Sequence, residues 1–375
     1  MKQRHDRLFA AAVAAVAIAA GMSTVPVAGQ SKITPRTQKA MPTGTAPVTR
    51  TADGHPDLQG VYDLATLTTL ERPGGVPLVM TDEQAVKLEK GVLDRIERAS
   101  LPSKGDRDAP PVGGDGSVGA AGNVGGYNNF WIDSGTQYNL IDGQKRSSIV
   151  IDPPDGRVPQ LTQEARRRAA ARVVQTTSDE SSREDDPGLE RAPGAYDDPE
   201  RRPLGERCLL GFGSTSGPPS LPVLYNNLHQ IVQTPDYIMI LNEMDHDARV
   251  IRMNAQHLPK TMRKWMGDSI GRWEGDTLVV DTTNFTDKTR FRGSTENLHV
   301  VERFSRKDGN TLLYRFTIED TATWEKPWTG EYSWPATNEH MYEYACHEGN
   351  YALGNILRGA REAEAKKATT KDEKK

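Results

Sequence analysis

Three short apolar runs follow one another in a stretch that begins at Gln230 and reads QIVQTPDYIMILNEMDHDARVIRM. The turn dipeptide Pro235-Asp236 separates the first two runs, and Asp245-His246-Asp247 separates the second from the third. β-Branched and apolar residues dominate each run, so the pattern predicts an antiparallel meander with an acidic, imidazole-bearing corner. The predicted strands are Ile231–Thr234, Tyr237–Met244 and Ala248–Met253.

Similar runs fill the rest of the segment 208–346, the strand-dense half of the chain. Glu274-Gly275-Asp276 and Lys307-Asp308-Gly309-Asn310 have the composition of hairpin turns. Links of this length leave no room for parallel crossovers of a dozen residues. The other predicted strands are Pro56–Asp63, Tyr127–Trp131, Ser147–Asp152, Ser269–Trp273, Thr277–Thr283, Asn297–Arg306, Thr311–Asp320, Glu331–Trp334 and His340–Cys346.

About eight or nine strands with short links favour a mainly β fold with a few peripheral helices. We expect an antiparallel up-and-down barrel of the lipocalin (calycin-like) type, with a sandwich as the alternative. The barrel is preferred because sequential strands pair most simply and because closure removes exposed edges.

Helical spacing occurs chiefly in Thr81–Ala99 and Leu161–Gln175. In the first segment Thr81 and Gln84 form a capping box. Its apolar stripe is expected to pack against the core, and the arginine run of the second segment is expected to face water. A short helix should follow Cys346. The stripe consists of Ala85, Leu88, Val92 and Ile96.

The N-terminus has the pattern of an export signal. Basic residues precede an Ala/Val-rich run over 8–22, and small residues precede Gln30. This run is shorter than the ~20 residues that span a bilayer, although an uncleaved anchor is the alternative. We expect a periplasmic or secreted protein without a transmembrane span. Its parts would be a signal peptide (1–29), a disordered lead-in (30–53), one β-rich domain (54–360) with loops over 102–126 and 176–207, and a charged tail (361–375).

Charge and cysteine content indicate which partners and cross-links are to be expected. The formal net charge is −4 and no basic patch stands out, so a nucleic-acid partner is not expected. Cys208 and Cys346 form an even pair, which in an exported chain predicts a disulfide. Two free buried thiols are the alternative. Neither cysteine belongs to a C-x-x-C pair, which argues against zinc.

Three near-matches to known motifs fail on their context. Gly114–Gly119 fits G-x-G-x-x-G but follows no apolar strand, so we expect a loop and no dinucleotide. Gly213–Gly217 has Thr215 at the nucleophile position of G-x-S-x-G, and Pro218-Pro219 prevents the helix that should follow. His347-Glu348-Gly349-Asn350-Tyr351 lacks the last histidine of H-E-x-x-H. We therefore expect no cofactor and no bound metal. A metal site formed by scattered histidines is the alternative, although no ligand pair has a recognised spacing: His229, His246, His299 and His347.

Strand alternation singles out Glu302. It shares a face with Val300 and Phe304, whereas His299 and Arg303 lie on the other face. A carboxylate pointing inward must be paired, or its pKa rises, and a raised pKa suits a general acid or base. The alternative is a structural Glu–Arg or Glu–Tyr pair. Glu243 also lies on an apolar face, beside the corner at His246, where flanking carboxylates could hold the imidazole as a base.

Four strings resemble an uncharacterised family of exported bacterial proteins: EMDHDARVIRM, GDSIGRWEGDTLVVDTTNF, NLHVVERF and YEYACHEGNY. The resemblance covers roughly 54–360. It implies export and makes these strings the natural place for a site, but it carries no reaction.

Two functions are open at this point. The first is an enzyme that uses acid/base chemistry on a small molecule in the barrel cavity, as a lyase, isomerase or hydrolase. The second is a non-catalytic, lipocalin-like ligand-binding protein, which would need an apolar cavity with few polar anchors. The candidate catalytic residues are Glu302, Glu243, His246, Asp247 and His347, and the candidate binding residues are Asn226, Asn227, His229, Arg249, Arg252, Trp273 and Tyr314.

Overall fold

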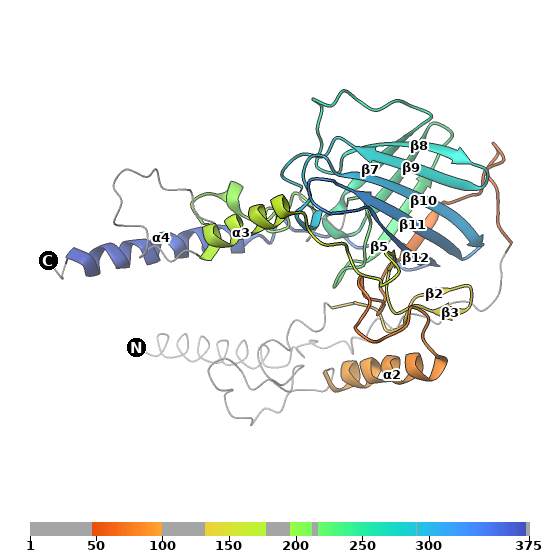
Figure 1. Cartoon of the computed structure of the whole chain (residues 1–375), viewed down its shortest axis with the longest axis horizontal. Coiled ribbons are helices and arrows are strands. Elements are labelled where there is room, and N and C mark those ends of the chain that lie inside the picture. Colours follow the sequence, from red (N-terminus) through yellow and green to blue (C-terminus); the bar gives the residue numbers. More distant parts are fainter. Residues whose placement is uncertain (1–46, 100–131, 178–195, 212–216, 290, 373–375) are drawn as a thin grey trace, which may run out of the picture. The chain divides into compact units, whose positions relative to one another are not determined.

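Nine strands close into a barrel in the computed structural model, whose described residues are 47–99, 132–177, 196–211, 217–289 and 291–372 (Figure 1). β12 pairs with both β11 and β1, which closes the sheet. The strands in spatial order are β1 (Gly60–Asp63), β5 (Leu228–Gln233), β6 (Tyr237–Asn242), β7 (Ala248–Met253), β8 (Asp268–Glu274), β9 (Thr277–Thr283), β10 (His299–Asp308), β11 (Thr311–Glu319) and β12 (Trp328–Thr337).

Neighbouring strands of the barrel are antiparallel at every pairing except one, which confirms the mainly β, mostly antiparallel prediction. β7 and β8 run parallel, with Ile251 opposite Ser269. The residues 254–267 make the connection between them. Our expectation that every link in this half is too short for a crossover was therefore wrong at this place, because a parallel pair requires just such a length.

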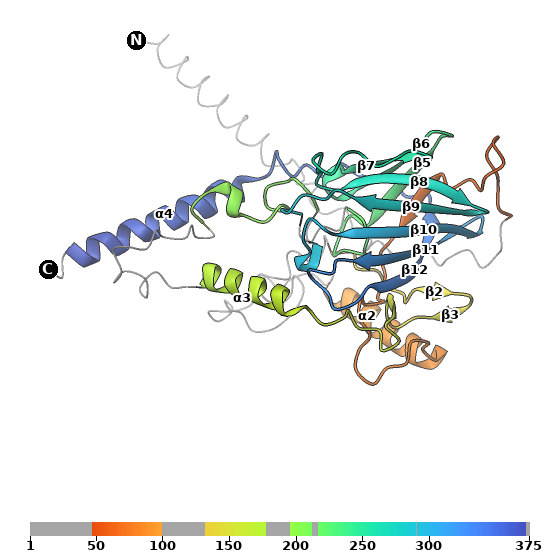
Figure 2. The ribbon, with the colours of Figure 1, turned by 45° about the horizontal axis from the view of Figure 1, so that its top comes forward.

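Three shorter strands lie outside the barrel circuit. β4 (Val150–Asp152) pairs with β12 on the side where β1 also pairs. β2 (Leu140–Ile141) and β3 (Gln144–Lys145) form a small hairpin. Figure 2 shows β8 to β12 side by side in one curved wall.

Large side chains fill the interior of the barrel. Alternate residues of β10, β11 and β12 are fully buried, and their rings are in mutual contact. The Trp334 ring lies 4.7 Å from that of Tyr314 and 5.5 Å from that of Phe304, between centroids. Burying such rings supplies most of the hydrophobic stabilisation of a core. The interior is thus a packed core along these three strands.

The α-helices of the described ranges are α2 (Asp82–Ala99), α3 (Gln163–Thr177) and α4 (Tyr351–Asp372). The capping box of α2 is present: Thr81 N donates to Gln84 Oε1, and Gln84 N donates to Thr81 Oγ1, both at 3.2 Å. The predicted apolar stripe is buried at Ala85, but Leu88 is 48% exposed, so the helix packs over less of its length than expected. None of the described helices is long and apolar enough to cross a membrane.

Short 3-10 helices occupy Pro199–Arg201, Met244–His246 and Phe291–Gly293. The segment 340–346, predicted as a strand, is irregular. It lies where the chain leaves the barrel, and a backbone bond from Tyr342 N to the Glu243 carboxylate takes the place of ladder bonds. The helix near the C-terminus is longer than expected and continues through most of the charged tail to Asp372.

The disulfide between Cys208 and Cys346 is present, with 5.7 Å between the Cα atoms. Part of the expected lead-in is anchored. Arg50 donates to both Asp276 oxygens at 2.9 and 2.7 Å, and His55 stacks on Trp273 with 4.5 Å between ring centroids. Several predictions lie outside the described residues: the signal peptide (1–29), the lead-in up to residue 46, the loop 102–126, the strand Tyr127–Trp131, the serine-rich motif at 213–216 and the linker over 178–195.

Candidate functional site

Glu302 points into the barrel, as strand alternation predicts, and none of its side chain is exposed. The guanidinium of Arg249 on β7 donates to both of its oxygens, through Nη2 to Oε1 at 2.9 Å and through Nη1 to Oε2. The Tyr314 hydroxyl on β11 donates to Oε1 at 2.7 Å. Both structural alternatives, the Glu–Arg pair and the Glu–Tyr pair, are therefore realised in one cluster.

Electrostatics in this cluster hold the ion pair together. Burial acts to lower the pKa of Arg249, but the charge of Glu302 outweighs it and the net shift is upward. Burial and the same carboxylate raise the pKa of Tyr314 well above its ordinary value, so its hydroxyl keeps its proton. Every oxygen of Glu302 has a donor. A fully satisfied buried pair of this kind belongs to the packing of the core.

His229 lies on β5, near Arg249 inside the barrel. Burial lowers the pKa of His229 to about 4, and the positive charge of Arg249 adds to the effect. Its Nδ1 lies 3.2 Å from the carbonyl oxygen of Asn227. The Asn227 amide in turn donates to backbone oxygens of Val223 and Asp133 at 2.9 and 2.8 Å. These contacts fix a turn, in which Asn226 adopts a left-handed φ of 56°.

Glu243, at the end of β6, uses its carboxylate on backbone amides. Oε1 accepts from Tyr342 N at 2.9 Å and Oε2 accepts from Leu228 N at 3.4 Å. Glu243 is 2% exposed. Its carboxylate therefore positions two backbone amides and holds the irregular segment 340–346 against the barrel.

Asp245, which follows next but one, has the opposite surroundings. It is 6% exposed, and neither carboxylate oxygen has a hydrogen-bond partner among the residues that the structure describes. Burial raises the pKa of Asp245, against the positive influence of His246 and His347. Both histidines are exposed. His246 adjoins Asp245 in the sequence, whereas His347 follows the strand-dense half, so the fold brings His347 to the same carboxyl group. Asp247 follows, half-buried.

The backbone at this corner is unusual. Asp245 and His246 both adopt left-handed conformations, with φ of 55° and 45°. Such conformations cost energy in residues other than glycine, and they cluster where a side chain has to be aimed for function.

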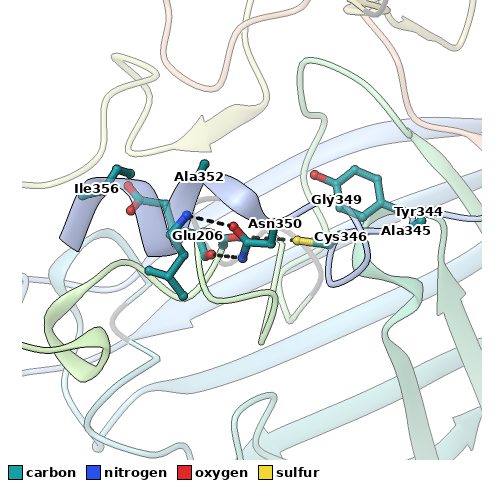
Figure 3. Close-up of a pocket in the computed structure, with 10 residues that line it drawn as sticks. Glu206, Tyr344, Ala345, Cys346, Gly349, Asn350, Ala352 and Ile356 are labelled. Atoms are coloured by element: carbon teal, nitrogen blue, oxygen red, sulfur yellow. Dashed lines mark hydrogen bonds between the residues drawn. The ribbon is translucent and has the colours of Figure 1, made fainter. Parts of the chain in front are cut away.

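A pocket of about 340 Å³ opens beside the disulfide (Figure 3). Apolar residues of α4 form part of its wall, and Glu206 and Asn350 provide polar groups. The Asn350 amide donates to the Glu206 carbonyl oxygen at 2.7 Å, while its own oxygen accepts from Leu353 N at 3.2 Å and begins α4. The lining residues are Gly205, Glu206, Tyr344, Ala345, Cys346, Gly349, Asn350, Ala352, Leu353 and Ile356.

Tyr344 connects the pocket with the corner. It lines the pocket and stacks on Tyr225, with 6.3 Å between ring centroids. Burial raises the pKa of Tyr344, and Tyr225 and the negative charge of Asp245 add to the rise. The raised pKa keeps the phenol of Tyr344 neutral, so it can donate a hydrogen bond, and the raised pKa of Asp245 lies closer to the range that suits a general acid or base.

The remaining predicted binding residues lie elsewhere. Arg252 donates to Asp268 at 2.9 Å, and Trp273 stacks on His55. The structure thus gathers Glu302, Arg249, Tyr314 and His229 in the core, and it gathers Glu243, His246 and His347 at the corner. Within the described ranges, no three His, Cys, Asp or Glu side chains stand in position to hold a metal ion.

Sequence reasoning passed over Asp245, Tyr344 and Tyr225 as individual candidates. Asp245 was noted only as a flank of His246, since Asp is an ordinary turn residue. The strings EMDHDARVIRM and YEYACHEGNY contain Asp245 and Tyr344 respectively, so pairing the two strings would have found the corner.

Comparison with known proteins gives no match: no family model, no curated protein and no solved structure is similar to this chain.

Proposed function

We propose that this chain is an exported enzyme that transfers protons on a small molecule bound in the pocket beside the corner at Asp245. The reaction would be an elimination, an isomerisation or a hydrolysis. One observation carries the proposal: within the described part of the chain the buried carboxyl of Asp245 has no hydrogen-bond partner, and it is held on a left-handed backbone. A pocket with a perturbed titratable group nearby is the usual mark of an active site.

Each group has a role that its surroundings suggest. Asp245, whose pKa burial raises, would act as the general acid or base. Tyr344, which lines the pocket, would contact the substrate and relay or donate a proton. His246 and His347 are exposed and would exchange protons with water. Glu243 would position the segment 340–346 that carries Tyr344.

Export enters the proposal through three observations. The N-terminal pattern is that of a signal peptide, and the strings quoted above resemble exported bacterial proteins. The Cys208–Cys346 disulfide is consistent with an oxidising compartment such as the periplasm.

The test is turnover of an untargeted metabolite extract, followed by mass spectrometry, with wild type, Asp245→Asn and a control. Asn keeps the size but removes titration, so turnover should fall by ~10²–10⁴. Asp236→Asn is the matched control, since Asp236 is an exposed turn residue at the other end of the β5–β6 hairpin. Equal turnover by wild type and Asp245→Asn contradicts the proposal. Retention of a compound without conversion indicates the binding protein instead.

A further inference from the structure

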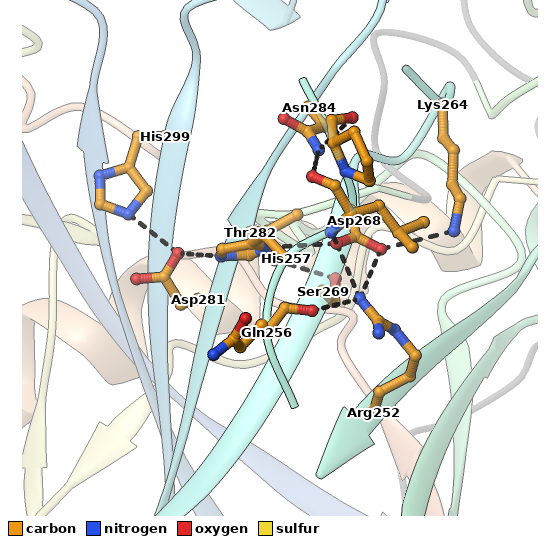
Figure 4. A network of polar contacts seen from close by, with 12 residues as sticks. Arg252, Gln256, His257, Lys264, Asp268, Ser269, Asp281, Thr282, Asn284 and His299 are labelled. Atoms are coloured by element: carbon orange, nitrogen blue, oxygen red, sulfur yellow. Dashed lines mark hydrogen bonds and ion pairs between the residues drawn. The ribbon is translucent and has the colours of Figure 1, made fainter. Parts of the chain in front are cut away.

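A network of histidines and carboxylates joins residues of β8, β9 and β10, and it contains none of the residues of the proposed site (Figure 4). It joins His299 on β10 to Asp281 on β9, and Asp281 to His257. His299 Nε2 lies 3.2 Å from Asp281 Oδ1, and His257 Nε2 lies 3.0 Å from the same oxygen. The side chains of His257 and Asp281 are each 27% exposed, so water reaches both of them.

His257 belongs to the link 254–267 between the parallel strands β7 and β8. Its other ring nitrogen, Nδ1, lies 3.2 Å from Asp268 Oδ2 at the start of β8. Asp268 also accepts from Leu258 N at 2.9 Å and from Arg252 of β7 at 2.9 and 3.1 Å. One residue of the link is therefore fastened to β8 and β9 at once.

The chemistry of these contacts requires a particular protonation state. An ionised carboxylate only accepts hydrogen bonds, and a neutral imidazole has one N–H. His257 places both of its nitrogens against carboxylate oxygens. Only the imidazolium can donate to both, so loss of one proton leaves a lone pair facing a carboxylate.

Other charged groups on the neighbouring strands and on the link lie close to this network. Glu319 of β11 lies 3.7 Å from His299 Nδ1, and Lys264 of the link lies 3.5 Å from Asp268 Oδ1. Arg252 of β7, which binds Asp268, and Asp281 of β9 are the other charged groups in this network. Each histidine thus faces two carboxylates.

We propose that this network of side chains is a pH-dependent clamp. It fastens the link 254–267 to the barrel wall at mildly acidic pH and releases it as the pH rises above neutral. His257 is the group that joins link and wall, and His299 is the outer partner that shares Asp281.

The direction of the pH dependence follows from the residues of the network whose pKa values are shifted. The hydrogen bond to Asp281 raises the pKa of His299, so its contribution is complete below ~6.5, the unfolded value, and is lost as the pH rises through a higher folded value. The hydrogen bond from His299 lowers the pKa of Asp281, so that contribution is lost only in stronger acid. The clamp is therefore closed between these limits.

Hydrogen exchange measured by mass spectrometry tests the clamp on the whole folded chain. Protection of the peptide 254–267, corrected for intrinsic rates and compared with the hairpin 229–241, should fall about 10-fold between about pH 5.5 and pH 8.5. In His257→Gln the protection should be low and equal at both pH values. His340→Gln changes an exposed histidine that does not belong to the network, so this variant should behave as wild type.

Unchanged protection in wild type, or a pH dependence that persists in His257→Gln, overturns the proposal. Should His257→Gln not fold, the ¹⁵N shifts of the His257 ring in wild type decide the question. Two protonated nitrogens at about pH 5.5 and one at about pH 8.5 support the clamp, and a neutral ring at the lower pH refutes it.

Discussion

Glu302 and Asp245 are both buried carboxylates, but their surroundings are opposite. Glu302 accepts from Arg249 on both oxygens and from Tyr314 on one, whereas the oxygens of Asp245 accept from no donor in the described ranges. A satisfied pair contributes to the core, while an unsatisfied buried polar group costs about 1–3 kcal/mol. This contrast moves the proposed chemistry from the barrel interior, where the sequence located it, to the corner.

The first prediction concerns Glu302. Replacing it by Gln leaves the charge of Arg249 buried without its partner, so unfolding stability should fall by ~3–5 kcal/mol in urea titrations. Glu319→Gln, on a side chain that is 50% exposed, serves as the control and should stay within about 0.5 kcal/mol of wild type. Near-native stability together with lost turnover would return Glu302 to the catalytic role.

The second prediction concerns His229, whose folded pKa of about 4 lies below the unfolded value. Between the two values the unfolded chain binds more protons, so stability should fall as the pH falls from ~6.5, by about 3 kcal/mol in total. In NMR titrations the His229 ring should remain neutral at about pH 5.5. Titration of His229 near 6.5 would contradict its burial.

At the level of elements, the sequence predicted most strands because period-2 alternation and hairpin turns are local signals. It predicted the inward face of Glu302 correctly for the same reason. The partners of Glu302 lie on β7 and β11. Because β8 and β9 separate β7 from β10 in the sheet, only closure of the barrel places β7 opposite β10. The parallel β7–β8 pair was missed because the loop 254–267 carries no helix to signal a crossover.

The segment 340–346 was predicted as a strand from its residue types, yet it is held by contacts that are distant in sequence. Glu243 binds the Tyr342 amide, and Cys346 is bonded to Cys208. Neither contact is visible in local periodicity. The corner site depends on both, because they bring Tyr344 and His347 to Asp245.

The third prediction concerns the disulfide, which closes a loop with a sequence separation of 138. Replacing both cysteines by serine should lower the stability by ~4–5 kcal/mol on the chain-entropy model. Urea unfolding of wild type with reductant should match the double variant, and the variant itself should not respond to reductant. A wild type that is insensitive to reductant would show that the cross-link does not constrain the unfolded chain.

At the level of the whole molecule, the closed barrel is a packed support and the proposed site lies outside it. Rings of Phe304, Tyr314 and Trp334 occupy the interior that the sequence reading assigned to a ligand. Alternation indicates which residues point inward, but it does not indicate whether their volumes leave a cavity. The pocket instead lies where α4, the disulfide and the chain leaving β12 meet.

The most direct test of the account compares Asp245→Asn with wild type in two assays on the same samples, turnover and thermal unfolding. Asn replaces a buried carboxyl group that has no hydrogen-bond partner among the described residues, and Asn tolerates the left-handed backbone well, so the variant should melt at the same or a higher temperature. Turnover should fall by ~10²–10⁴. A variant that melts markedly lower, or one that retains wild-type turnover, would contradict the assignment of Asp245 as the proton-transferring group.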